Sequence, residues 1–279
     1  MDTLGQRVQL GHAAAEQLTQ YLHTLPAEAW HHPSACEGWE VRDVVGHLTW
    51  VAELYAGGVS RGVQEDTAPL EGCPPARSLE KAALSAFFAQ RSIARRESLG
   101  EQLLPTFTAR HTHLHHLLHN LGAQDWEQLC YHPNGIRPAQ QFITMWLTEV
   151  AMHAWDIWSV REPARALFAE SLPIFMEGMP RVVALSFQPG VRLRVPIRYG
   201  FAVTGAVPSQ YTIAIAGDVV QLEPHSDPEA NVLCRCDTET FVLLMYGRLS
   251  LPSAIGSGRV VVEGDQGLMT TFGTWFKFV

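Results

Sequence analysis

Apolar residues in the first half of the chain recur at the three- and four-residue spacing of amphipathic helices. Residues 4–25 carry this pattern at Leu4, Val8, Ala15, Leu18, Tyr21, Leu22 and Leu25, and Pro26 ends it. A second helix is predicted over residues 41–56, closed by Gly57-Gly58. The period of these segments favours helices that each bury one face.

Two further regions extend the helical pattern. Residues 79–121 form either one long helix or two helices broken near Gly100 and Pro105. Pro138 suits a first helical turn, and the pattern that follows it continues until Pro163. Long helices joined by loops of this kind predict an all-α, four-helix bundle.

The second half of the chain changes to the alternating pattern of strands. A connecting helix interrupted by Pro173 and Pro180 is expected over residues 165–187. The strand candidates that follow are VRLRVPIRY, YTIAIAG, VVQLEP, NVLCRCD and RVVVEGD. Helical stretches at residues 238–246 and 266–276 interrupt them, which predicts a small α+β domain. The chain is therefore expected to be multidomain, with a bundle over residues 1–165 and an α+β domain over residues 166–279.

Composition narrows the class of protein. The 279 residues are 47% hydrophobic and 17% charged, which is typical of a globular chain. A net charge of -8 argues against a nucleic-acid partner held by a basic surface. Neither a secretory signal nor an apolar run near the roughly 18 residues of a membrane span is present. The odd number of cysteines without framework spacing indicates reduced thiols, so we expect a cytoplasmic protein with no membrane partner.

Glu149 and His153 are the first candidate ligands for a metal. They are four residues apart in a predicted helix, so both side chains lie on one face. His47 lies in an apolar helical stretch and needs a partner for its ring nitrogens. Two imidazoles and a carboxylate are ordinary zinc ligands, and a catalytic site leaves one further position open. From spacing alone a surface pair or a buried hydrogen bond explains these residues equally well.

A rival metal site is the histidine-rich stretch HTHLHHLLH. His111, His115 and His119 share a helix face at four-residue spacing. This stretch contains no carboxylate, which favours a solvated helix face or a cleft lining over a metal site. Asp43, one turn before His47, either orients that ring or compensates the helix dipole. Asp156 and Trp39 are interpreted as packing and loop-fixing residues.

The segments WHHPSACEGWEVRDVVGHL and TMWLTEVAMHAWDIW resemble the two signatures of the DinB-like mycothiol-dependent maleylpyruvate isomerase family. In the first signature, Cys-x-x-Trp-x-Val-x-Asp-x-x-x-His supplies a metal ligand. TMWLTEVAMHAWDIW is similar to the second, in which a Glu and a His four residues later supply two more. The resemblance implies that His47, Glu149 and His153 bind a divalent metal, with zinc as the expected ion.

The second half resembles the sterol-carrier-protein-2-like (SCP2-like) domain. DPEANVLCRCDTETFVLLMYGRLS followed by GRVVVEGDQGLMTTF carries this similarity. An SCP2-like domain after a DinB-like bundle is the arrangement of the isomerase family, in which an arginine of the second domain serves the active site. That position corresponds to Arg248, which would act in catalysis and in cofactor binding, with Arg259 as the alternative. A helix-end arginine that contacts the last carbonyls explains Arg248 without any substrate.

The resemblance implies an enzyme that uses an external low-molecular-weight thiol, mycothiol or an analogue, as cosubstrate. The expected reaction is thiol addition to a small electrophile, as in maleylpyruvate cis–trans isomerisation or thiol S-transfer. Two alternatives are a metal-dependent hydrolase and a non-enzymatic carrier of an apolar ligand. The sequence does not identify the thiol, the electrophile or the metal, and it leaves open whether the chain forms a homodimer.

Overall fold

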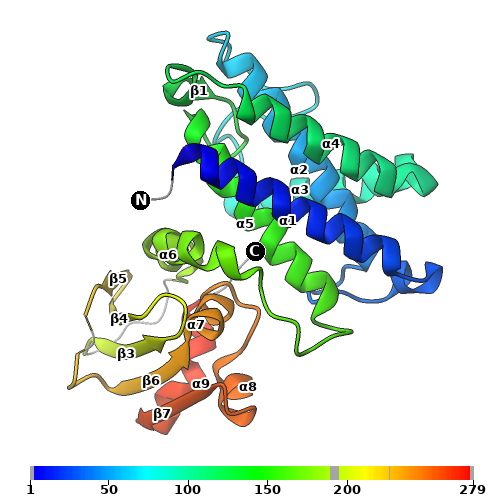
Figure 1. Ribbon diagram of the computed structural model, residues 1–279. Coiled ribbons are helices and arrows are strands. Elements are labelled where there is room, and N and C mark those ends of the chain that lie inside the picture. The colour runs from blue at the N-terminus through cyan, green and yellow to red at the C-terminus, as the bar shows by residue number, and fades with distance from the viewer. Residues whose placement is uncertain (1–2, 189–194, 226, 277–279) are drawn as a thin grey trace. The chain divides into compact units, whose positions relative to one another are not determined.

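The computed structural model describes residues 3–188, 195–225 and 227–276. The chain divides into two compact units, Met1–Ser171 and Leu172–Val279. The first unit is helical and the second contains a sheet with helices (Figure 1). The predicted fold class, a helical bundle followed by a small α+β domain, is confirmed.

Five long helices build the first unit. They are α1 (Leu4–Thr24), α2 (Val41–Gly62), α3 (Lys81–Leu99), α4 (Leu103–His119) and α5 (Ala139–Trp158). Helices α1, α2, α4 and α5 close a bundle, because α1 and α2 each pack against both α4 and α5. Helix α3 packs on α2 from outside this set. Large apolar side chains, including Leu18, Phe142 and Trp146, are fully buried in the unit.

The predicted region 79–121 is two helices rather than one. Gly100 adopts a φ of 51° at the end of α3, a conformation that glycine tolerates best. A 3₁₀ turn, η2 (Gly100–Gln102), then leads directly into α4. Pro105 lies in the first turn of α4, where a missing backbone N–H costs little.

The predicted end of the second helix at Gly57-Gly58 is wrong. Helix α2 continues to Gly62, and its glycines serve close packing rather than termination. A Cβ at Gly58 would lie 2.5 Å from the carbonyl oxygen of Tyr131, and one at Gly62 would lie 2.4 Å from Sγ of Cys130. The glycines therefore allow the segment after α4 to lie directly against α2.

Short elements complete the first unit. They are the 3₁₀ turns η1 (Ala27–His31), η3 (Asp125–Glu127) and η4 (Ala169–Ser171), and the antiparallel pair β1 (Leu129–Cys130) and β2 (Arg137–Pro138). Strand β2 leads directly into α5, so Pro138 becomes the residue that precedes its first turn.

The second unit has a five-stranded sheet in the order β5-β4-β3-β6-β7. Its strands are β3 (Ile197–Thr204), β4 (Ser209–Ala216), β5 (Val219–Glu223), β6 (Val232–Asp237) and β7 (Val260–Gly264). Neighbours are antiparallel except β3 and β6, which are parallel. Residues 191–194 of the first predicted strand lie outside the described residues.

Helices α6 (Leu172–Ser186), α7 (Thr238–Met245), α8 (Leu251–Gly256) and α9 (Gln266–Trp275) belong to the same unit. Pro173 and Pro180 do not break α6, which carries Pro180 in its interior. Asp237 caps α7 by accepting a hydrogen bond from the backbone N–H of Thr240. Helix α8 was not predicted from the sequence. Among the described residues, no helix has the length and apolar composition to cross a membrane.

The five cysteines are free thiols. Cys234 and Cys236 share the buried face of β6, and burial raises the pKa of each thiol to about 12. They remain protonated at neutral pH, which agrees with their interpretation as small buried residues rather than metal ligands.

Candidate metal centre

Helices α2 and α5 bring the three candidate metal ligands together. Glu149 and His153 are one turn apart on α5, and His47 comes from the middle of α2. Nε2 of His47 lies 3.2 Å from Oε2 of Glu149, and Nε2 of His153 lies 3.3 Å from the same oxygen. One donor atom from each residue lies within 4.8 Å of the other two. The three predicted ligands thus form one cluster inside the first unit.

Ser92 of α3 fixes the orientation of the His47 ring. Its hydroxyl donates to the carbonyl oxygen of Phe88 at 2.7 Å and lies 3.2 Å from Nδ1 of His47. Because the hydroxyl proton is already used, the serine oxygen accepts from Nδ1–H. Nε2, which faces Glu149, is therefore the ring nitrogen left to bind a metal.

Asp156 fixes the orientation of the His153 ring, as Ser92 does for the His47 ring. This fully buried carboxylate lies 2.8 Å from Nδ1 of His153 and accepts from its N–H, so Nε2 is again the ring nitrogen left to bind a metal. The thiol of Cys36 also donates to Asp156, at 3.1 Å. The carbonyl oxygen of Asp156 accepts from the backbone of Ala35. The sequence-based interpretation of Asp156 as a loop-fixing residue covers this last contact but misses the contact with His153.

The charges of the cluster are strongly coupled. Burial opposes ionisation of Glu149, but hydrogen bonds from His153 and His47 outweigh it, so the pKa of this carboxyl lies well below its usual range. Burial also opposes protonation of His153, yet hydrogen bonds with Asp156, Cys36 and Glu149 raise its pKa well above the ordinary value.

The donor set fits a divalent cation. Two imidazole nitrogens and one carboxylate oxygen converge, and each histidine is hydrogen-bonded through its remaining nitrogen, as metal-binding histidines usually are. Three protein ligands are the usual number at a catalytic zinc, where the fourth position is left to water or substrate. Zinc is the ordinary ion for such a set, although other divalent metals accept the same ligands.

Asp43 contacts the start of α2. Its carboxylate accepts from the backbone N–H of Glu40 at 2.9 Å and thereby caps α2, and it also lies 3.2 Å from Nε of Arg96. These contacts agree with the alternative in which Asp43 serves the helix terminus. Trp39 packs edge-on against the His47 ring at 5.5 Å, as its interpretation as a packing residue implies.

The histidine-rich stretch of α4 is separate from the three donors. His111 is buried, and its Nδ1 accepts a hydrogen bond from the indole N–H of Trp146 at 2.9 Å. Burial lowers the pKa of His111 to about 3, so the ring is neutral at physiological pH. His113 and His116 are exposed, as expected for a solvated face. His115 and His119 face α1 and are considered below.

The first unit matches the model of a known protein family. Residues 12–158 match the family model of the mycothiol maleylpyruvate isomerase N-terminal domain. The match covers more than half of the chain and includes all three donors. The chain belongs to this family. Membership agrees with the resemblance of the two ligand-bearing segments described above.

The second unit matches the SCP-2 sterol transfer family over residues 196–277. The crystal structure of the mycothiol-dependent maleylpyruvate isomerase aligns over 94% of this chain and 93% of its own, with a TM-score of 0.62 and 14% identity. At this identity the alignment shows a shared fold across both units.

Two other solved structures are similar to only part of this chain. YfiT from Bacillus subtilis, described as a probable metal-dependent hydrolase, is 19% identical over 59% of this chain and 89% of its own, with a TM-score of 0.44. Sterol Carrier Protein 2 Like 2 from Aedes aegypti is 13% identical over 38% and 94%, with a TM-score of 0.27. No curated protein sequence matches the chain.

The two candidate arginines of this family member lie in the second unit. Arg248 follows α7, and its Nη1 donates to the carbonyl oxygen of Tyr246 at 3.2 Å, a contact expected of a helix-end arginine. Arg259 donates from Nε to the hydroxyl of Thr240 and lies 3.8 Å from Glu239. The first turn of α7 thus holds the guanidinium of Arg259.

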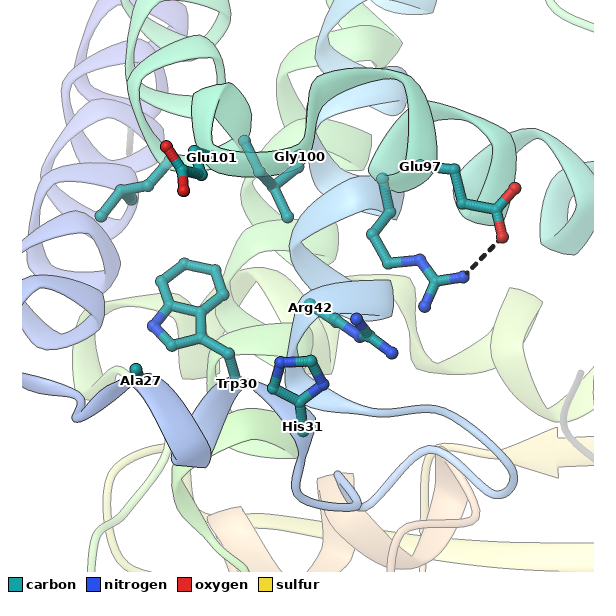
Figure 2. Close-up of a pocket in the computed structure, with 10 residues that line it drawn as sticks. Ala27, Trp30, His31, Arg42, Glu97, Gly100 and Glu101 are labelled. Carbon is teal, nitrogen blue, oxygen red and sulfur yellow. Dashed lines mark hydrogen bonds and ion pairs between the residues drawn. The ribbon is translucent and has the colours of Figure 1, made fainter.

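A cleft of about 750 Å³ opens at the start of α2 in the first unit. Figure 2 shows Trp30 and His31 on one side of it and Gly100 and Glu101 on the other. None of the three donors lines this cleft. Arg96, which contacts Asp43, forms part of its wall and links it to the capped end of the helix that carries His47.

Proposed function

We propose that this chain is a metal-dependent enzyme that uses a small external thiol, mycothiol or an analogue, to attack an electrophilic substrate. The reaction class is thiol addition to an activated double bond followed by elimination, as in cis–trans isomerisation, or retention of the adduct, as in S-transfer. The observation that carries the proposal is the convergence of His47, Glu149 and His153 with both ring tautomers already fixed for metal binding.

The chain's own residues prepare the site. Ser92 and Asp156 hold the imidazoles so that both Nε2 atoms face Glu149. Trp39 covers the ring of His47 from the side. A divalent ion bound by the three donors supplies the Lewis acidity that keeps a coordinated thiol deprotonated at neutral pH. Membership of the isomerase N-terminal domain family supports a thiol in the open position in preference to water.

Cys36 is a poor candidate for the reacting thiol. Its Sγ donates to Asp156 and lies 3.6 Å from Nδ1 of His153, the nitrogen that points away from metal binding. It therefore contacts Asp156 and the side of the His153 ring that does not face Glu149. We expect Cys36→Ala to retain both metal and thiol-dependent turnover, and loss of turnover with retained metal would contradict an external thiol.

We propose that Arg248 binds a carboxylate of the substrate or of the thiol cosubstrate. A guanidinium forms two parallel hydrogen bonds with a carboxylate, which gives orientation as well as charge. The family resemblance of the Gly-Arg segment supports this role. Arg248→Lys keeps the charge and loses the paired geometry, so it should raise KM more than it lowers kcat, whereas Arg259→Lys should change neither.

A turnover assay tests the function. Zinc-reconstituted protein is mixed with maleylpyruvate as a cis-configured probe, and loss of the cis isomer is followed with and without mycothiol or glutathione. We expect turnover only with a thiol, abolished in His153→Ala and retained in the matched control His113→Ala. Product formation without any thiol would favour a hydrolase. No metal binding after reconstitution would favour an apolar-ligand carrier.

A further inference from the structure

A second group of metal-binding side chains lies where α1 packs on α4. His12 and Glu16 are four residues apart on α1, and His115 and His119 are four residues apart on α4. Each pair therefore shares one face of its helix. These residues are distinct from the three donors of the first site, so the arrangement owes nothing to the proposed function.

The contacts between the two pairs are close. The rings of His12 and His115 stack with centroids 3.9 Å apart and planes 7° apart. Nε2 of His12 lies 3.4 Å from Oε1 of Glu16. The ring of His119 lies 5.7 Å from that of His115, and the amide of Gln9 contacts its Nδ1 at 3.4 Å. Three imidazoles and one carboxylate thus lie near one another across the helix pair, without the short mutual donor distances of the first site.

His115 is the residue that requires explanation. Both of its ring nitrogens are covered from solvent and have no hydrogen-bond partner among the described residues. Covering a polar atom without a partner costs free energy, unless a ligand supplies the missing interaction.

We propose that His12, Glu16, His115 and His119 form a second divalent-metal site, suited to zinc or another ion that prefers imidazole. The sequence argued against a site in HTHLHHLLH because that stretch contains no carboxylate, but α1 supplies Glu16. Parallel stacked rings do not aim both nitrogens at one point, so binding requires His12 or His115 to rotate about its side-chain bonds. Glu16 and His119 are exposed, which leaves the ion open to solvent on one side.

Zinc titration of the His153→Ala chain isolates this site, because the first site lacks a ligand there. We expect about one zinc per chain, with His12→Ala and His119→Ala each weakening the binding by roughly tenfold or more. His113→Ala and His116→Ala are matched controls on the same helix and should leave the affinity unchanged. Helical circular dichroism verifies that each variant is folded.

A structural readout separates a built site from scattered surface binding. Zinc should shift the ring resonances of His12, His115 and His119 in ¹⁵N-edited spectra and leave those of His113 and His116 in place. Equal losses in all four alanine variants would overturn the proposal, as would unchanged binding in His12→Ala and His119→Ala. Because the background already lacks His153, failure here says nothing against the first site.

Discussion

The two histidines of the first site differ in the group that contacts their Nδ1 atom. His47 uses a serine hydroxyl from α3, and His153 uses a buried carboxylate three residues further along its own helix. Both contacts leave Nε2 as the ring nitrogen to bind a metal, so neither ring needs to change tautomer. We therefore expect the metal affinity of this site to depend on Ser92 and Asp156 as well as on the three donors.

Ser92→Ala tests this dependence. The variant removes the acceptor for Nδ1 of His47 while the ligand itself remains, so we expect zinc affinity to fall by roughly 10- to 100-fold. Competition with a chromophoric chelator measures the affinity. Ser98→Ala is the matched control, since Ser98 also donates to a carbonyl of α3 but is exposed. Equal affinities of Ser92→Ala and the native chain would contradict the role of Ser92.

His111 gives a prediction for stability against pH. Its pKa is about 3 in the folded chain, below the ordinary 6.5, because the ring is buried. Below pH 6.5 the unfolded chain takes up a proton that the folded chain does not, so stability falls as the pH drops from 7 toward 3. The loss from this residue is about 2 kcal/mol at pH 5.

Urea unfolding at pH 7 and pH 5 measures the effect. His111→Gln keeps an acceptor for Trp146 but does not titrate, so its loss of stability between the two pH values should be smaller than that of the native chain. Equal losses in the two proteins would show that His111 is protonated in the folded state.

Single-residue chemistry was only partly predictable. The four-residue spacing of Glu149 and His153 indicates a shared face, whereas His47 joins them through the resemblance to a family signature. Ser92 carries no signal in the sequence, because its contact with His47 depends on how α3 packs on α2. Asp156 follows His153 by three residues, so the two side chains share a helix face. This spacing could have predicted their contact.

At the level of elements, α2 shows why a glycine pair inside a helix can be wrongly predicted to end it. Gly57-Gly58 predicted an end, since glycine costs about 1 kcal/mol in a helix interior. Helix α2 instead runs past both residues because the chain around Tyr131 and Cys130 lies against its glycine face. The close approach is a tertiary feature that no local pattern contains. Most strands, by contrast, followed their alternating pattern closely.

Gly58→Ala should destabilise the first unit by about 1–3 kcal/mol. The added Cβ would lie 2.5 Å from a backbone oxygen, which cannot move without displacing its segment. Gly57→Ala is the control, because its Cβ would meet only the end of the Leu70 side chain, at 3.0 Å. Chemical denaturation compares the two. Similar stabilities would show that the segment shifts freely and that Gly58 is not a packing requirement.

At the level of the whole molecule, the change from helical to alternating patterns predicted two kinds of structure in the right order. The family match over residues 12–158 and the sterol-carrier match over residues 196–277 follow the same order. The fold class of each part was therefore predictable from the hydrophobic pattern, although several helix boundaries were not. The metal-binding role was not predictable in this way, because the four-residue spacing of Glu149 and His153 is equally consistent with an ordinary side-chain pair on a helix.

The most direct test of the account is the visible spectrum of the cobalt-substituted chain as a small thiol is added. A thiolate that binds cobalt at the first site should produce a sulfur-to-metal charge-transfer band in the native chain and in His12→Ala, and no such band in His153→Ala. This result would place thiol and metal together at His47, Glu149 and His153. An equal band in His153→Ala, or a native chain that binds cobalt without responding to thiol, would contradict the account.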